Sequence, residues 1–248
     1  MEARRASKIR AVIFDIGGVV VKSPFLAISA YEREHGLPAN YINVALSRRG
    51  DAGAFQQYER GEISHSDFVD QWTDELNDVA ANNAAYRGYL QRRNLDTRMV
   101  LPGKTQINGS VLFARMMDVA QTPNPCVVEL IRWLRRCGYR VAALTNNFQN
   151  DVTSGKMRDE IFQALFDEFV ESSVVGLRKP DARFYLHACN LLEVGPEEVV
   201  FLDDIGKNLR AADRLGMTAV QVEIGREQQA VDAVKKLVRA RGAFAPKI

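Results

Sequence analysis

Cysteine and histidine are scarce in this sequence. Three cysteines occur among 248 residues, at Cys126, Cys137 and Cys189, and none belongs to a Cys-x-x-Cys pair. An odd, widely spaced set forms neither the disulfide framework of a secreted scaffold nor a cysteine zinc site. We expect three small core side chains in a protein of a reducing compartment. The three histidines also lack the mutual spacing of a zinc site.

Net charge is equally low. Lys and Arg number 33 and Asp and Glu 31, so the formal net charge is +2, with both signs spread along the chain. This balance provides no broad basic surface for nucleic acid or an anionic membrane. We therefore expect no nucleic acid and no membrane as partners. A phosphate-sized anion is not excluded, because it needs only local positive charge.

Long apolar runs are absent as well. The basic segment Met1–Arg5 leads into a strand of only a few apolar residues, too short for a signal-peptide core or a membrane span. We expect a cytoplasmic protein. The composition is 46% hydrophobic, which excludes a disordered chain. The length suits one large α/β domain, or a core domain with a smaller insert.

The most informative pattern is a strand that ends in a carboxylate. Ala11–Phe14 is apolar, Asp15 follows directly, and Gly17 and Gly18 then allow a sharp turn. Open α/β sheets bind their ligands at the carboxyl ends of the strands. Asp15 is therefore a candidate nucleophile.

After Asp15 the strand pattern stops for about a hundred residues, far longer than an ordinary connection. Apolar residues recur at helical spacing from Pro24 to about Leu95, and Ser64 with Asp67 resembles a capping box. These residues predict a small helical module. The stretch Asn82–Asn108 has few apolar repeats and is interpreted as a mobile insert or linker.

From Pro125 onward, helices alternate with strands. Cys126–Arg136 predicts an amphipathic helix, and four further strands are expected at Tyr139–Leu144, Phe169–Val174, Val199–Leu202 and Thr218–Val222. Alternation of this kind predicts a parallel sheet with right-handed crossovers. The predicted fold class is α/β, a Rossmann-like three-layer parallel sheet core with an inserted α-helical cap. The expected core domain is 1–23 with 111–248, the expected cap is 24–110, and an apolar cap face suggests a possible homodimer.

Polar residues lie at or just beyond the ends of these strands: Asp15, Thr145 with Asn146, Lys179, and Asp203 with Asp204. The ends of parallel strands share one edge, so these side chains should converge. Paired aspartates with Asp15 suit Mg²⁺, which takes oxygen ligands from carboxylates, water and substrate phosphate.

The clusters resemble the four motifs of the haloacid dehalogenase superfamily. The resemblance extends over most of the chain, through the segments Glu59–Ser64, Leu144–Asn147, Gly176–Pro180 and Phe201–Leu209. Within that superfamily the chain is most similar to the N-terminal phosphatase domain of soluble epoxide hydrolases, a related domain of acyl-CoA dehydrogenase family members, and bacterial sugar-1-phosphate phosphatases.

The resemblance implies a role for each motif residue. Asp15 would be the nucleophile that forms an aspartyl-phosphate. Thr145 and Asn146 would bind the phosphoryl oxygens, and Lys179 would offset their charge and steady Asp15.

The resemblance also implies a metal site. Asp204, assisted by Asp203, would bind Mg²⁺ together with a carboxylate oxygen of Asp15 and the backbone carbonyl of Gly17. A small phosphorylated substrate would complete the site.

Gly17 departs from the superfamily's common pattern, in which an aspartate at this position moves a proton to the leaving group. Loss of a general acid or base typically lowers the rate by about 10²- to 10⁴-fold. His65, Asp51 or Glu62 from the helical module could substitute, or the leaving group could be acidic enough to depart unaided. Lys207 and Arg210 could contact substrate, but we expect both at the solvated surface.

Three functions compete. The first is a Mg²⁺-dependent phosphatase that hydrolyses a small phosphomonoester through an aspartyl-phosphate. The second is a 2-haloacid dehalogenase, which needs no metal and typically lacks the aspartate pair seen at Asp203 and Asp204. The third is a weakened relative that binds phosphorylated ligands or protein partners, a reading favoured by Gly17.

Overall fold

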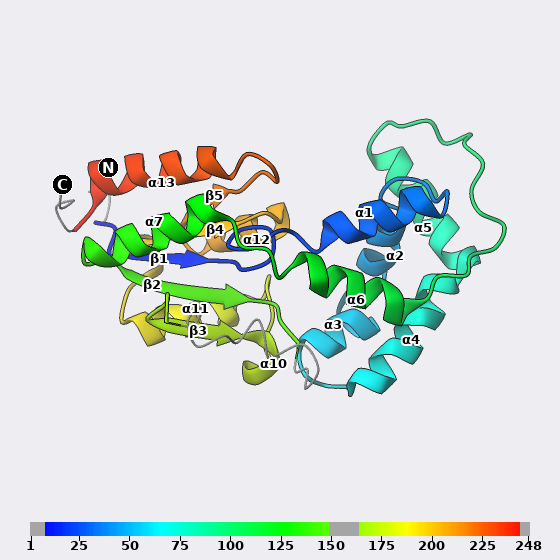
Figure 1. Ribbon diagram of the computed structural model, residues 1–248, viewed down its shortest axis with the longest axis horizontal. Helices are drawn as coiled ribbons and strands as arrows, with labels where there is room; N and C mark the ends of the chain where they lie inside the picture. Colours follow the sequence, from blue (N-terminus) through cyan, green and yellow to red (C-terminus); the bar gives the residue numbers. More distant parts are fainter. Residues whose placement is uncertain (1–7, 149–163, 244–248) are drawn as a thin grey trace.

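The computed structural model describes residues 8–148 and 164–243. A sheet domain and a helical domain lie side by side (Figure 1). The five strands of the sheet are all parallel, in the order β3-β2-β1-β4-β5. Their bounds are β1 Ala11–Phe14, β2 Arg140–Thr145, β3 Glu168–Glu171, β4 Val199–Asp203 and β5 Thr218–Gln221. The predicted parallel sheet is confirmed.

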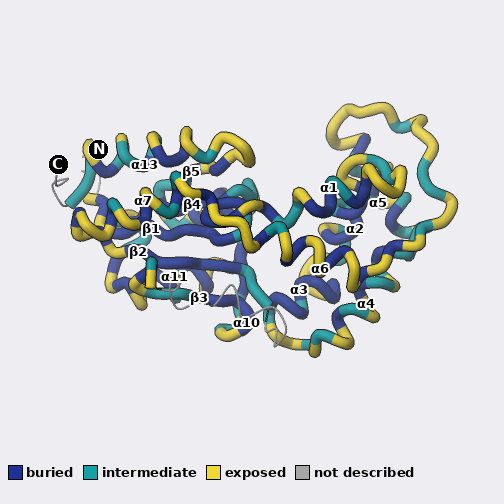
Figure 2. The backbone as a smooth tube through the Cα atoms, in the orientation of Figure 1, coloured by how far each residue is buried: buried dark blue, intermediate teal, exposed yellow. Residues whose placement is uncertain are grey.

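Helices cover both faces of the sheet, which makes three layers. Helices α7 (Pro125–Arg136) and α13 (Glu227–Arg241) pack on one face, and α11 (Ala182–Leu192) and α12 (Gly206–Arg214) contribute to the apolar cluster of the other. Alternate residues of β1 enter the two clusters, so the strand is apolar throughout and fully buried. Figure 2 shows these central strands in dark blue.

The strand register positions the functional residues. Phe14 at the end of β1 pairs with Ala143 of β2 and Leu202 of β4. The next residues therefore leave the sheet together, and the backbone N–H of Asp15 donates to the carbonyl of Leu202 at 2.8 Å. Asp15, Thr145 and Asp203 thus emerge at the same edge, as the sequence predicts.

The helical domain contains six α-helices in the described part of the chain. They are α1 Phe25–Glu34, α2 Tyr41–Arg48, α3 Ala54–Glu59, α4 His65–Asn77, α5 Val79–Arg92 and α6 Gly109–Val119, with a 3₁₀ turn at Gly50–Ala52. The Ser64 hydroxyl caps α4 by accepting from the N–H of Asp67 at 3.1 Å. An aromatic cluster that includes Phe55, Tyr58 and Trp72 forms the core of this domain.

Helix α6 packs with the cap helices. Its apolar residues Leu112, Phe113, Met116 and Met117 join the aromatic cluster rather than the clusters of the sheet. The expected boundary at residue 110 assigns most of α6 to the sheet domain. The packing differs from that expectation because the apolar face of α6 meets α1 and α4.

The segment Asn82–Asn108 is partly helical, contrary to its interpretation as an insert or linker. Helix α5 continues to Arg92 and packs on α2. Asn82 is 1% exposed, and its amide donates to the carbonyls of Glu75 and Leu76, both at 3.0 Å. A buried polar residue at this position interrupts the apolar repeat, so the sequence pattern does not predict helix α5.

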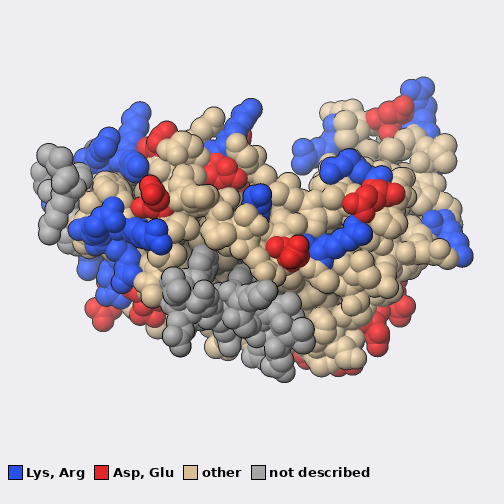
Figure 3. All heavy atoms as spheres, in the orientation of Figure 1, with Lys and Arg blue, Asp and Glu red and all other residues tan. Residues whose placement is uncertain are grey.

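The strand expected at Phe169–Val174 is shorter than predicted. β3 ends at Glu171, and Ser172–Val175 forms a short helix, α10. A further 3₁₀ turn, Pro196–Glu198, precedes β4. Among the described residues no helix has both the length and the apolarity to cross a membrane. On the face drawn in Figure 3, acidic and basic side chains are interspersed.

Candidate active site

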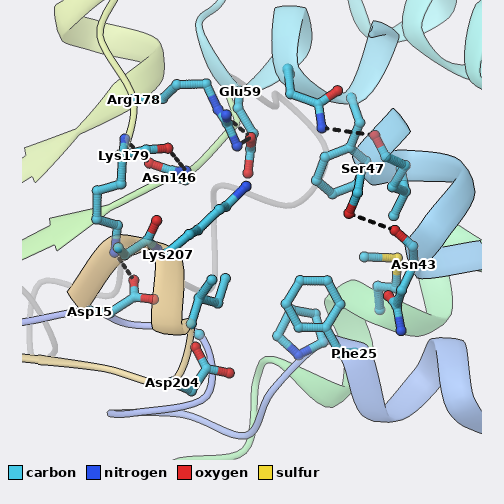
Figure 4. A pocket seen from close by; sticks show the side chains of 18 of the residues that line it. Asp15, Phe25, Asn43, Ser47, Glu59, Asn146, Arg178, Lys179, Asp204 and Lys207 are labelled. Carbon is cyan, nitrogen blue, oxygen red and sulfur yellow. Dashed lines mark hydrogen bonds and ion pairs between the residues drawn. The ribbon is translucent and has the colours of Figure 1, made fainter. Parts of the chain in front are cut away.

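Lys179 lies at the centre of the carboxyl edge of the sheet. Its ammonium is 2.8 Å from Oδ1 of Asp15 and 2.8 Å from Oδ2 of Asp203, and the side chain is 1% exposed (Figure 4). Burial acts to lower the pKa of Lys179, but the two carboxylates outweigh burial and hold it above its ordinary value. Lys179 therefore remains a fixed positive charge between two aspartates.

Asn146 fixes the backbone at Lys179. Its Oδ1 accepts from the N–H of Lys179 at 2.8 Å, and its Nδ2 donates to the Lys179 carbonyl at 3.2 Å. The side chain thus serves the loop that carries the lysine. Thr145 ends β2, is 5% exposed and lines a cavity that lies between the sheet edge and the cap. Binding of phosphoryl oxygens by Thr145 and Asn146 stays a prediction.

Three carboxylates meet at this edge. Asp15, Asp203 and Asp204 each offer an oxygen, and these atoms lie within 4.8 Å of one another. Burial chiefly, and then repulsion from Asp203 and Asp204, raises the pKa of Asp15 to about 8 despite the attraction of Lys179. Burial and the neighbouring Asp203 raise the pKa of Asp204 to about 7.

The donor set fits a hard divalent cation. Three carboxylates face one ammonium, which leaves excess negative charge in a buried place, and a divalent cation would offset it. Oδ1 of Asp204 is buried and has no hydrogen-bond partner within residues 8–148 and 164–243. A carboxylate oxygen in this state is available to bind a metal ion. The ligand roles of Asp15, Gly17, Asp203 and Asp204 stay predictions.

The two aspartates after β4 have different surroundings. Oδ1 of Asp203 accepts from the N–H of Ile205 at 2.8 Å, and the Asn208 amide lies 3.1 Å from both oxygens of Asp203. Asp203 is therefore saturated and serves mainly to orient Lys179. Oδ2 of Asp204 accepts a long bond of 3.3 Å from the Ser23 hydroxyl. No sequence pattern indicates this contact of Ser23.

The turn after Asp15 approaches Asp204 closely. Gly18 has a φ of +84°, and a Cβ there would lie 2.2 Å from Oδ2 of Asp204. Only glycine fits at this place. Gly17 lines the cavity, and a Cβ there would lie 3.3 Å from Cδ of Pro24.

A cavity of about 600 Å³ opens between the sheet edge and the cap. Asp15, Lys179 and Asp204 lie at its sheet end. Most of the cavity surface is apolar, from Phe25, Leu46, Phe55, Met116 and Met117 of the cap and from Phe148 and Ile224 of the sheet domain. The cap also contributes polar lining residues: Asn40, Asn43, Ser47, Gln56, Glu59 and Arg93. The cavity can hold a small molecule with one anionic end and one apolar end.

The cap and the sheet domain are joined beside this cavity by a buried ion pair. Arg178 donates from Nε to Oε2 of Glu59 at 2.7 Å and from its terminal nitrogen to the same oxygen at 2.5 Å. The Ser172 hydroxyl also donates to the backbone carbonyl of Glu59. Sequence reasoning did not assign Glu59 and Arg178 a contact, because the two residues lie 119 positions apart.

The three expected substitutes for a proton-transferring aspartate lie elsewhere. Among the described residues that line the cavity, His65, Asp51 and Glu62 do not occur. The His65 ring bonds the Tyr58 hydroxyl at 3.1 Å, the Asp51 side chain is 90% exposed, and Glu62 pairs with Arg60 at 2.6 Å. His65 and Glu62 are thus held by partners within the cap, whereas Asp51 lies 3.9 Å from the cavity residue Arg178 without lining the cavity itself.

The five-stranded parallel sheet, the helical cap and an acidic crevice around one lysine together define a Rossmann-like α/β fold with an aspartate at the end of its first strand. The sequence pattern of the haloacid dehalogenase-like hydrolases matches residues 9–216, and the chain belongs to this family. A HAD-like family hydrolase from Porphyromonas gingivalis has the same fold, with a TM-score of 0.62 at 20% identity, over 94% of this chain and 99% of that one.

Curated relatives are similar over most of the chain. Acyl-CoA dehydrogenase family member 10 of Mus musculus is 30% identical over 92% of this chain, and bifunctional epoxide hydrolase 2 of Sus scrofa is 28% identical over 86%. The chain spans only 19% and 36% of the lengths of these two relatives. The resemblance to these families is confirmed.

Other relatives differ in the activity their names state. Sesquiterpene phosphatase astK of Aspergillus oryzae is 25% identical over 86% of this chain and 89% of its own length. The (S)-2-haloacid dehalogenase 4A of Burkholderia cepacia is 28% identical over 86% of this chain and 83% of its own. Family membership alone therefore does not choose between phosphate esters and haloacids.

Proposed function

We propose that this protein is a Mg²⁺-dependent phosphatase that hydrolyses small phosphomonoesters with a largely apolar leaving group. The observation that carries the proposal is the charge pattern at the sheet edge. Lys179 bridges Asp15 and Asp203, while Asp204 holds a buried oxygen without a partner. A phosphoryl group needs both the lysine and a cation beside the carboxylates.

Each residue of the site has its own role in the proposed hydrolysis. A carboxylate oxygen of Asp15 attacks phosphorus, the ester P–O bond breaks, and water then hydrolyses the aspartyl-phosphate to inorganic phosphate. Lys179 holds the Asp15 carboxylate in place and offsets charge on the phosphoryl oxygens, to which the Thr145 hydroxyl donates. Asp15 and Asp204, with the Gly17 carbonyl, would hold Mg²⁺, which when bound offsets the repulsion between nucleophile and phosphate.

The charge of the site argues against a haloacid substrate. A 2-haloacid is an anion that would enter without a cation, beside three carboxylates and one lysine. Without a cation, the raised pKa keeps the Asp15 nucleophile largely protonated near neutral pH, and ionising it beside Asp203 and Asp204 would oppose the binding of that anion. Halide release is nevertheless measured as a control activity.

The first test is phosphate release from a panel of phosphomonoesters, with Mg²⁺ and with EDTA. We expect turnover that requires Mg²⁺ and is lost in Asp15→Asn. Asp181→Asn is the matched control, because Asp181 pairs with Arg183 at the surface. Turnover that persists in Asp15→Asn, or halide release without phosphate release, would overturn the proposal.

The second test concerns the leaving group. A prenyl or medium-chain alkyl phosphate should have a lower KM than a sugar phosphate of equal charge, because the cap wall is apolar. Phe25→Ala should raise the KM of the alkyl ester and leave that of the sugar phosphate nearly unchanged. The name of the Aspergillus oryzae relative supports this choice of substrate.

A further inference from the structure

The proposed reaction has an unfilled role. When an ester P–O bond breaks, an alkoxide leaves unless a proton reaches its oxygen, and Gly17 has no side chain to supply one. A proton donor must line the cavity on the side of the phosphoryl group opposite Asp15, since nucleophile and leaving group stand in line.

Few side chains satisfy that requirement. Apart from Asp15, Lys179 and Asp204, the charged residues that line the cavity within the described ranges are Glu59, Arg93, Arg178 and Lys207. An arginine does not give up its proton in a protein. Burial raises the pKa of Glu59 despite Arg178, but Arg178 donates twice to its Oε2, so this carboxyl is held in the ion pair between the domains. Lys207 is left.

Lys207 occupies a suitable place. It belongs to the first turn of α12, three residues after Asp204, and its side chain extends across the cavity from the sheet edge toward Glu59 of the cap (Figure 4). Figure 4 marks no ion pair between Lys207 and the other side chains drawn. A leaving group directed toward the cap would pass this ammonium.

The surroundings of Lys207 come from three parts of the chain. They are Arg178 and Asp203 of the sheet domain, Glu59 at the end of α3, and Asp51 in the turn before it. Burial and then the Arg178 charge lower the pKa of Lys207, and the three carboxylates oppose them without cancelling them. A lowered pKa makes a lysine a better proton donor.

We infer that Lys207 is a catalytic residue that donates the proton to the leaving oxygen, in the role that Gly17 leaves vacant. This inference rests on the proposed phosphatase function. Lys207 is exposed, as expected of a surface lysine, but its side chain also lines the cavity.

The proton balance closes over one turnover. As Asp15 attacks, the P–O bond to the leaving group breaks, and that oxygen takes a proton from the Lys207 ammonium to leave as an alcohol. The neutral amine of Lys207 then takes a proton from the water that attacks the aspartyl-phosphate. The bond from phosphorus to Asp15 breaks, and the carboxylate, the ammonium and inorganic phosphate result.

The test compares two esters in Lys207→Met. An alkyl phosphate has a poor leaving group that needs the proton, whereas p-nitrophenyl phosphate has a leaving group that departs as the anion. For the alkyl ester we expect kcat/KM to fall by about 10²- to 10³-fold, the range for loss of a general acid. For p-nitrophenyl phosphate kcat should change little. Arg210→Met, an exposed residue of the same helix, is the matched control.

Lys207→Arg separates charge from proton transfer. It keeps the positive charge but cannot donate, so it should be as impaired as Lys207→Met on the alkyl ester. Small primary amines should restore turnover of the alkyl ester by Lys207→Ala, and Gly17→Asp should restore it in Lys207→Met.

The outcomes separate the two proposals. Equal losses with both esters, or full activity of Lys207→Arg, would overturn the role of Lys207 and leave the phosphatase standing. Absence of turnover by the wild-type protein with either ester would instead overturn the phosphatase function, and the role of Lys207 with it.

Discussion

The Arg178 guanidinium holds the Glu59 carboxylate across the seam between the two domains, through contacts of 2.7 and 2.5 Å to one oxygen. Both side chains are buried, at 8% and 6% exposure. Burial raises the pKa of Glu59, and the Arg178 charge opposes that rise. Arg178 directly precedes Lys179 in sequence, so the ion pair joins the cap to the loop that carries Lys179.

Removal of one partner should destabilise the protein strongly. Arg178→Met leaves a buried carboxylate uncompensated, so the free energy of unfolding should fall by about 3–5 kcal/mol. The double variant Glu59→Leu with Arg178→Met should recover most of the loss, because neither charge remains. Urea unfolding measures both.

The matched control is an exposed ion pair. Arg183→Met removes a partner of Asp181 where the Arg183 side chain is 73% exposed, and should cost less than about 1 kcal/mol. If the double variant is as unstable as Arg178→Met, the seam is held by packing or by Ser172 rather than by charge.

The metal-free protein should lose stability as pH rises. The pKa of Asp15 is about 8 and that of Asp204 about 7, both above the ordinary 3.8. The folded state therefore retains protons that the unfolded chain releases. The stabilisation is complete below about pH 4 and is lost as pH rises through 7 and 8.

Urea unfolding of the EDTA-treated protein at pH 5.5 and at pH 8 measures this pH dependence of stability. Mg²⁺ should raise the midpoint at pH 8 and have little effect at pH 5.5, because the carboxylates must lose their protons to bind it. Asp204→Asn should reduce both the pH dependence and the response to Mg²⁺. An EDTA-treated wild-type protein of equal stability at the two pH values would contradict the account.

The sequence predicts which polar residues meet at the carboxyl edge of the sheet, because all the strands are parallel. Each strand is a short apolar run, and the polar residue after it must appear at a common edge. Asp15, Thr145 and Asp203 follow from that rule alone. The clamp from Asn146 to the backbone of Lys179 does not, since an amide that binds main chain looks the same in sequence as one that binds a ligand.

Contacts between the domains were beyond sequence reasoning. Glu59 and Arg178 meet only because the cap folds back on the sheet, and neither lies in a periodic pattern that would indicate a partner. Lys207 is exposed, as a lysine in the first turn of a helix usually is. The cap places a second wall opposite it and turns that surface into a cavity.

Gly18 should control metal binding through its lack of a side chain. Gly18→Ala would place a Cβ 2.2 Å from Oδ2 of Asp204 at a φ of +84°. Asp204 must then move, and Mg²⁺ affinity should fall by about 10- to 100-fold, the range seen when support of a ligand is lost. Calorimetric titration with Mg²⁺ measures the affinity.

Two further alanine variants test whether the collision with Asp204 causes the loss of Mg²⁺ affinity. Gly17→Ala meets only the Pro24 ring at 3.3 Å and should keep most of the Mg²⁺ affinity. Gly36→Ala has a similar φ of +64° but finds no atom within 4 Å, so it reproduces the backbone strain without the collision. Gly36→Ala should lose stability and keep its metal affinity. If Gly18→Ala binds Mg²⁺ as tightly as Gly36→Ala does, Asp204 is not a ligand, because a ligand displaced by a new methyl group cannot hold the ion unchanged.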